Sequence, residues 1–323
     1  MTFNTLPKFA GAFFKWLSRI GCGLLILLTF NSTTLAVDLL YVSNGNTIVS
    51  YETTGVDGVA IAATMTTFAN MGGSSGLAFD LSGNLYVSQM GNDTIRKFNS
   101  SGAYVSIINT NLSGPSGLAC DTSGNLYAAN HLAGAYGNTI SKFDSSGVYV
   151  SSISSNLSSP RNLSFDTSGN LYAANPYGSY GNTISKFDSS GVYVSNISSN
   201  LSSPYGQTFD NLGNLYAANF GGNSISKFDS SGVYLSNITT NLVSPSDLAF
   251  DSLGNLYAVN YTSNTISKFD SSGTFLTSWS TGYPLYSLAF RPVSVPEPST
   301  YILAAIAAGV MAYLASRRNA RTA

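Results

Sequence analysis

The stretch LAFDSLGNLYAVNYTSNTISKFDSSGTFLTSW, residues 248–279, contains four short runs rich in aliphatic, aromatic and β-branched residues. Segments of Gly, Asn, Asp and Ser separate the runs, and these residue types favour tight turns. Short runs of this composition at regular spacing predict β-strands joined by turns. The stretch therefore predicts a four-stranded antiparallel unit.

The unit is repeated along the chain, because the phrase Gly-Asn-Leu-Tyr occurs five times at intervals of 41 to 45 residues. The copies start at Gly83, Gly124, Gly169, Gly213 and Gly254. Four strands in every period of about 40 residues are typical of a β-propeller blade. No window between Val37 and Pro292 shows a sustained helical period, so we expect an all-β domain there.

The ends of the repeat array predict how the propeller closes. The second-strand phrase occurs six times, starting near Leu39, Leu85, Leu126, Leu171, Leu215 and Leu256. The array begins on a second strand, at Leu39, and ends on a lone first strand at residues 287–291. We predict a six-bladed β-propeller in which these two half-blades form one blade, since closure removes exposed sheet edges. An open solenoid of the same blades is the alternative.

The repeat resembles the NHL-repeat family in Leu248-Ala249-Phe250-Asp251, Gly254-Asn255-Leu256-Tyr257 and residues 266–273, which recur from about residue 74 to 290. The second strand of that family usually ends in Asp. Here the position holds Asn44, Gln89, Asn130, Asn175, Asn219 and Asn260. We therefore expect a less acidic rim on this face than the resemblance implies.

Residues 1–36 have the composition of a secretory signal peptide. Basic residues including Lys15 and Arg19 precede an apolar run at residues 23–30, and small residues lead up to Ala36. This order predicts export with cleavage after Ala36. Cys22 precedes the apolar run rather than following it, so no lipid anchor is predicted.

The carboxyl end combines three features in a fixed order. Pro296, Glu297 and Pro298 are followed by an apolar segment at residues 301–315, and then by Arg317 and Arg318. Basic residues after an apolar segment favour a transmembrane helix with its charges in the cytoplasm. The segment resembles the PEP-CTERM sorting signal. That resemblance implies a bacterial envelope protein, cleaved by an exosortase-type enzyme and common in cells that produce exopolysaccharide. A plain membrane anchor is the alternative.

We therefore predict a signal peptide at 1–36, a propeller at 37–293 and a sorting signal at 294–323. The segment from Val37 to Ser294 holds eight Lys and Arg against fourteen Asp and Glu, a formal charge of −6. A mildly acidic domain without basic stripes argues against nucleic-acid binding. It also argues against binding to anionic lipid surfaces. Cys120 is the one cysteine left after processing, so no disulfide is expected, and it replaces a Phe of the other repeats, which predicts a buried thiol.

The repeated aspartates have a structural explanation. They begin turns, where an Asp side chain accepts backbone N–H groups two residues on. These are Asp80, Asp121, Asp166, Asp210 and Asp251 in the first turn of each repeat, and Asp144, Asp188, Asp229 and Asp270 in the second. Asp-x-x-Gly-Asn supplies too few oxygen ligands for calcium. His131 is the single histidine and lies in a loop, so we expect a solvated residue rather than a zinc ligand.

The candidate binding residues are those at which the repeats differ. The loops between second and third strands carry aromatic side chains on the propeller face where loops two-to-three and four-to-one meet. These are Tyr136, Tyr177, Tyr180, Phe220 and Tyr261. Loops on a rigid scaffold commonly carry binding residues, and exposed rings can stack on sugars. Drift in unconstrained loops is the alternative.

The starts of the inner strands, at the channel mouth on the same face, also differ between repeats. Most residues there are small, and the exceptions are Arg161, Asn162, Tyr205, Asp247 and Tyr286. Gln207 stands where the other repeats have Leu, and a polar residue at such a position needs a partner. We predict a small-ligand site at this ring. The alternative is an Arg161–Asp247 ion pair without a ligand.

Two functions follow from these patterns. We favour a non-enzymatic binding module of the cell surface or matrix that contacts polysaccharide or another surface protein, without cofactor, metal or catalytic residue. The alternative is an enzyme resembling the gluconolactonase and regucalcin group, or the propeller lyases. The former resemblance implies a channel metal held by Glu, Asp and Asn, but Glu52 is the one Glu in the domain and lies outside the channel. The lyase resemblance implies several histidines. The propeller could also be a stable cargo of the sorting system.

Overall fold

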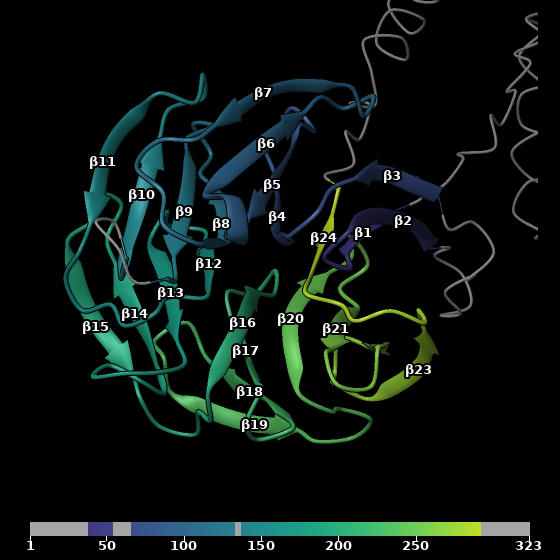
Figure 1. Ribbon diagram of the computed structural model, residues 1–323. Coiled ribbons are helices and arrows are strands. Elements are labelled where there is room, and N and C mark those ends of the chain that lie inside the picture. Colours follow the sequence, from purple (N-terminus) through teal and green to yellow (C-terminus); the bar gives the residue numbers. More distant parts are fainter. Residues whose placement is uncertain (1–37, 54–65, 133–136, 292–323) are drawn as a thin grey trace, which may run out of the picture. The chain divides into compact units, whose positions relative to one another are not determined.

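The computed structural model describes residues 38–53, 66–132 and 137–291, which form six four-stranded antiparallel sheets. Figure 1 shows the sheets arranged around a common axis. The innermost strands β4, β8, β12, β16, β20 and β24 each contact the next in a complete ring. The predicted six-bladed β-propeller is therefore confirmed, and the open solenoid is excluded.

The blades are numbered here in chain order, beginning with the closing blade. The closing blade comprises β24 (Ser287–Phe290), β1 (Asp38–Ser43), β2 (Thr47–Thr53) and β3 (Thr66–Asn70). Blade 2 comprises β4 (Ser74–Phe79), β5 (Leu85–Gln89), β6 (Thr94–Phe98) and β7 (Tyr104–Ile108). Blade 3 comprises β8 (Pro115–Cys120), β9 (Leu126–Asn130), β10 (Thr139–Phe143) and β11 (Tyr149–Ile153).

The remaining three blades follow the same order from the innermost to the outermost strand. Blade 4 comprises β12 (Asn162–Phe165), β13 (Leu171–Asn175), β14 (Thr183–Phe187) and β15 (Tyr193–Ile197). Blade 5 comprises β16 (Pro204–Phe209), β17 (Leu215–Asn219), β18 (Ser224–Phe228) and β19 (Tyr234–Ile238). Blade 6 comprises β20 (Pro245–Phe250), β21 (Leu256–Asn260), β22 (Thr265–Phe269) and β23 (Phe275–Ser280).

The closing blade joins the two ends of the repeat array, as the sequence predicts. Strand β24 pairs antiparallel with β1, with Tyr41 opposite Ala289 and Val42 opposite Leu288. The two strands lie side by side in Figure 1 although more than 240 residues separate them. The ring therefore closes by backbone hydrogen bonds between its first and last strands.

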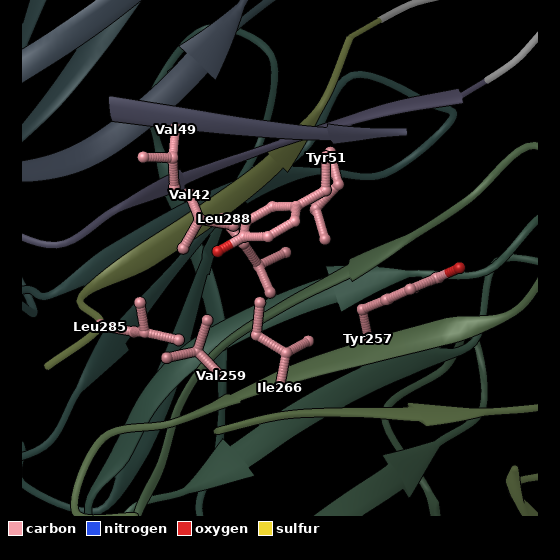
Figure 2. Close-up of a cluster of buried hydrophobic side chains, with 9 residues drawn as sticks. Val42, Val49, Tyr51, Tyr257, Val259, Ile266, Leu285 and Leu288 are labelled. Carbon is pink, nitrogen blue, oxygen red and sulfur yellow. The ribbon is translucent and has the colours of Figure 1, made fainter. Parts of the chain in front are cut away.

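Apolar side chains fill the space between neighbouring blades. At the closure, Val42, Val49 and Tyr51 of the closing blade pack against Val259 and Ile266 of blade 6 (Figure 2). All five side chains are at least 95% buried. Comparable buried clusters lie between the other pairs of blades. Fully burying one such side chain stabilises a protein by roughly 1.5–3 kcal/mol, so closure adds to the core as well as to the sheet.

The turn aspartates act as the sequence predicts. Asp251 Oδ1 accepts the backbone N–H groups of Leu253 and Asn255 at 3.0 and 2.7 Å. Gly254 has φ +82°, a backbone conformation that residues other than Gly rarely adopt. The other first-turn and second-turn aspartates make equivalent bonds. The repeated acids are therefore occupied by the turns that they stabilise.

The third-strand lysines are likewise used within their blades. Lys227 Nζ lies 3.8 Å from Asp210 Oδ2 and 4.9 Å from the centre of the Tyr216 ring. The Tyr216 hydroxyl donates to the same Asp210 oxygen at 3.4 Å. Lysines 97, 142, 186 and 268 lie over the corresponding tyrosines in blades 2, 3, 4 and 6. These cations therefore belong to the end of each blade that carries the first turn.

Five of the six amides at the ends of the second strands are buried, and Asn44 is half-buried. Asn175 is fully buried, and its Oδ1 accepts the Ser158 N–H at 3.0 Å. Its Nδ2 donates to the hydroxyls of Ser185 and Thr183 at 2.9 and 3.3 Å. Both hydroxyls donate in turn to backbone carbonyls. We call this set of hydrogen bonds, which joins strands two and three to the preceding loop, the clip. The same clip is made by Asn130, Asn219 and Asn260.

Within residues 38–53, 66–132 and 137–291, one helical element departs from the all-strand expectation, a 3-10 turn at Met90–Asn92 in blade 2. Among the residues described, no helix is long and apolar enough to cross a membrane. The predicted signal peptide at 1–36 and the sorting signal at 294–323, including its transmembrane helix, lie outside the described residues. The domain boundaries therefore remain predictions.

Candidate functional site

The candidate site lies where the second-to-third-strand loops meet the starts of the inner strands. Tyr177 follows β13, while Phe220 and Tyr261 follow β17 and β21. The loop backbones are held in place, since the N–H groups of Phe220 and Tyr261 donate to the Ser203 and Ser244 carbonyls at 3.1 Å. The rings are thus carried on loops that are bonded to the rigid inner strands.

The aromatic side chains form a continuous series, which we call the aromatic arc. The Tyr205 ring stacks on Phe220 with centres 4.1 Å apart and planes at 11°. Tyr177 meets Tyr205 edge to face at 5.9 Å, and their hydroxyls share a hydrogen bond. The ring centres of Phe220 and Tyr261 are 5.9 Å apart, and those of Tyr261 and Tyr286 are 5.5 Å apart. The arc therefore runs from blade 4 through blades 5 and 6 to the start of the closing blade.

Arg161 lies against the aromatic arc. Its guanidinium carbon is 4.7 Å from the centre of the Tyr205 ring, within the range of a cation–π contact. Its backbone is fixed by an N–H bond to the Ala174 carbonyl at 2.9 Å and by the Ser116 hydroxyl, which donates to the Arg161 carbonyl at 3.0 Å. The ion pair between Arg161 and Asp247, which the sequence left as the alternative to a ligand site, is absent from the part of the chain that the structure describes. An ion pair therefore does not explain why these two residues depart from the repeat.

Asp247 is instead the centre of a hydrogen-bonded plug in the channel. Asn162 Nδ2 donates to Asp247 Oδ1 at 3.0 Å, and the Ser287 hydroxyl donates to Asp247 Oδ2 at 2.6 Å. The Leu248 and Leu288 N–H groups donate to the same carboxylate at 2.9 and 3.1 Å. Burial raises the pKa of Asp247 to about 6. Blades 4, 6 and the closing blade thus meet at one carboxylate.

The plug is possible because the other three blades have glycine at the same position. A Cβ on Gly206 would lie 2.5 Å from the Asp247 Cα, and one on Gly117 would lie 2.5 Å from the Asn162 Cα. Such distances are too short for any side chain, so the inner strands approach closely only with Gly there. Three blades therefore have Gly at this layer, and the other three have Asn162, Asp247 and Ser287.

Two hollows open above the plug. One of about 170 Å³ is lined by Arg161, Asn162 and Asp247 together with Tyr205, Phe220, Tyr261 and Tyr286 of the aromatic arc. A second, of about 750 Å³, lies beside it against the closing blade and blade 2. Its lining includes Gly45, Met90, Tyr283 and Tyr286, and Arg161 lines both hollows. The two spaces therefore meet at Arg161 and Tyr286.

Three predicted site residues are not part of this arrangement. Gln207 is 3% exposed and lines the opposite channel mouth, and its amide has no hydrogen-bond partner among the described residues. Tyr180 is 39% exposed and lies outside the ring contacts that build the arc. Tyr136 lies outside the described residues. The structure therefore brings together Arg161, Asn162, Tyr205, Asp247, Tyr286, Tyr177, Phe220 and Tyr261.

His131 is half-buried, so its assignment as a solvated residue is wrong. Its ring centre lies 6.5 Å from that of Tyr177, which extends the aromatic series into blade 3. Nδ1 lies 3.1 Å from the Ser159 carbonyl oxygen and therefore carries the proton. Burial, with a smaller effect of the Arg161 charge, lowers the pKa of His131. The sequence feature that sets His131 apart is the loop of residues 131–137, which is longer than the equivalent loops of the other repeats.

The described residues contain no group of three His, Cys, Asp or Glu side chains that could hold a metal ion. Cys120 is half-buried. Burial raises the pKa of its thiol to about 12. The thiol is therefore protonated at neutral pH and a poor nucleophile.

A family model matches the carboxyl end of the chain. Residues 294–319 match the PEP-CTERM protein-sorting motif, which indicates export and sorting to the cell envelope or surface. No curated protein matches the chain in sequence.

Solved structures share the propeller fold at low identity. A chain of a nidogen/laminin complex has a TM-score of 0.68 at 18% identity, covering 79% of this chain and 98% of that one. A protein of unknown function from Bacteroides caccae gives 0.61 at 13% identity, with 80% and 100% covered. Virginiamycin B lyase from Staphylococcus aureus gives 0.57 at 16% identity, with 76% and 84% covered. The protein is accordingly a six-bladed β-propeller that carries a PEP-CTERM sorting motif at its carboxyl end.

Proposed function

We propose that the protein is an exported, non-enzymatic binding module that takes a carbohydrate at the aromatic arc. The observation that carries this proposal is the series of five rings at one channel mouth, in which each ring contacts the next. Tyr177 and Tyr286 remain 44% and 39% exposed there. Rings with an apolar face and a polar edge match the mixed surface of a sugar.

The place of action follows from the sorting motif. A chain processed at this motif by an exosortase-type enzyme would leave the propeller at the bacterial cell surface or in the extracellular matrix. Polysaccharide is abundant in such a matrix, and another surface protein is the second candidate partner. A membrane-bound stage before processing is part of the same proposal.

An enzymatic role in the channel has one observation in its favour, the raised pKa of Asp247. Four hydrogen-bond donors already engage that carboxylate, which leaves it poorly placed to take a proton from a substrate. The likeness to virginiamycin B lyase is one of fold. A catalytically inactive histidine-to-alanine variant of that lyase has also been solved, whereas this chain has a single histidine.

The proposal is tested by affinity electrophoresis of the full chain in gels that contain defined polysaccharides. We expect at least one polysaccharide to retard the protein, and the variants Tyr177→Ala and Tyr286→Ala to bind it about five- to tenfold more weakly, since one aromatic contact contributes about 1 kcal/mol. Tyr104→Ala is the matched control, because Tyr104 is 56% exposed on the outer strand β7. Equal retardation of all four proteins, or of none by any polysaccharide, would reject the proposal.

A further inference from the structure

The two faces of the propeller differ in charge. The turn aspartates and the third-strand lysines lie at the end of each blade that carries the first and second turns. The residues lining the two hollows at the opposite mouth include two charged side chains, Arg161 and Asp247. Asp247 is 4% exposed, so Arg161 is the charge that a ligand entering this mouth would meet.

Arg161 has no anionic partner among the described residues. The four ion pairs there join third-strand lysines to first-turn aspartates. The carboxylate deepest in the mouth, Asp247, is instead bonded by Asn162, Ser287 and two backbone N–H groups. A partly buried cation without a counter-charge is costly, and natural proteins usually pair such groups.

The guanidinium lies against the aromatic arc with an unused donor. Its Nε is buried and has no hydrogen-bond partner among the described residues, and its carbon lies 4.7 Å from the centre of the Tyr205 ring. Its positive charge acts to lower the pKa values of His131, Tyr177 and Tyr286, although burial raises the pKa of both tyrosines overall. The positive potential therefore extends over the aromatic arc.

We propose that the site selects an acidic sugar, with the carboxylate of a uronic acid residue paired to Arg161 while the sugar rings pack on Tyr286 and Tyr177. An arginine fork matches a carboxylate in two parallel hydrogen bonds, which a neutral sugar cannot form. This inference rests on the proposed carbohydrate-binding function. It adds the charge of the ligand and the residue that reads it.

The test compares oligouronates of about six sugars with their methyl esters, which keep the rings and remove the charge. Two glycosidic linkages are used, and affinity for the full chain is measured by titration calorimetry. We expect the acid to bind at least tenfold more tightly than its ester. Arg161→Gln should weaken binding of the acid at least tenfold and leave the ester unchanged. A monomeric uronic acid, measured in parallel, shows how much of the affinity comes from a single carboxylate and how much from the rings of the arc.

Lys142→Gln is the matched control, because it removes one positive charge from the opposite end of a blade, where Lys142 lies over Tyr127. It should bind both forms as the parent does. Equal affinity for acid and ester, or an unchanged preference in Arg161→Gln, would overturn the acidic selection and leave carbohydrate binding intact. Absence of binding to the oligouronates together with retardation by a neutral polysaccharide would have the same meaning. Absence of binding to every sugar would overturn both proposals.

Discussion

At the scale of single residues, Asp247 is 4% exposed and accepts hydrogen bonds from four donors in three blades. Its carboxylate ties the inner strands together at the one layer where Asn, Asp and Ser replace Gly. Burial outweighs the hydrogen bonds and raises the pKa of Asp247 from its ordinary value of 3.8 to about 6. This residue therefore couples the stability of the propeller to pH.

The sign of that coupling follows from the direction of the shift. Between pH 4 and 6 the folded protein binds more protons at Asp247 than the unfolded chain does. Its contribution is fully present below pH 4 and is lost as the pH rises through 6, a difference of about 3 kcal/mol for two pKa units. We expect the free energy of unfolding in urea to fall over this range.

Asp247→Asn should abolish this fall and also destabilise the protein, because either orientation of the amide places an N–H group against a backbone N–H of Leu248 or Leu288. The exposed turn variant Asp144→Asn should keep the pH dependence between 4 and 6, since hydrogen bonds from Ser146 and Val148 lower the pKa of Asp144. Identical pH profiles for the parent and Asp247→Asn would show that another group is responsible.

At the scale of the strand, the clip at the end of each second strand explains the departure from the aspartate of the NHL-repeat pattern. Asn175 Nδ2 faces two hydroxyl oxygens whose protons are donated elsewhere, to the carbonyls of Tyr180 and Asn156. An aspartate would place a buried oxygen against both. The position therefore needs a donor, which Asn has and Asp lacks.

We expect Asn175→Asp to destabilise blade 4 by about 2–4 kcal/mol, because it introduces a buried, unsatisfied acceptor. Chemical unfolding at pH 7 measures the loss. Asn46→Asp is the control, since Asn46 is exposed in the turn between β1 and β2. A loss at position 175 no larger than that at position 46 would show that the donor is dispensable.

At the scale of the whole molecule, the ring depends on the pairing of its first and last strands. Leu288 lies opposite Val42 and is 3% exposed, and Leu285 is fully buried in the same interface. Deleting residues 285–291 removes β24 and leaves β1 and β20 without their neighbour on that side. The loss reaches the candidate site too, because Tyr286 and Ser287 belong to the deleted segment.

We expect this deletion to lower the melting temperature by more than 10 °C or to abolish cooperative unfolding, since it opens the ring and exposes one buried interface. Differential scanning calorimetry measures the effect. A chain that ends at residue 293 keeps β24 and serves as the control. If the two shortened chains melt alike, closure contributes little to stability.

Much of the fold could be predicted from the sequence because each repeat states its own strands and turns. Asp251 and Gly254 predict their turn from local chemistry alone. The pairing of β24 with β1 is predictable because the repeat array begins on a second strand and ends on a lone first strand. The candidate site was harder to predict. The departures of Arg161 and Tyr205 from the repeat were visible in the sequence, but their mutual contact was not.

The amino-acid sequence by itself determined the blade, the number of blades, the way they close and the sorting motif, because these depend on local turn chemistry and on repetition. Only the tertiary structure decided that Asp247 bonds Asn162 and Ser287 rather than Arg161, that Gln207 faces the other mouth, and that five rings meet in one arc. Those outcomes depend on which way each side chain points across a channel shared by six blades. Distances across a closed ring join residues from different repeats, and no single repeat encodes them.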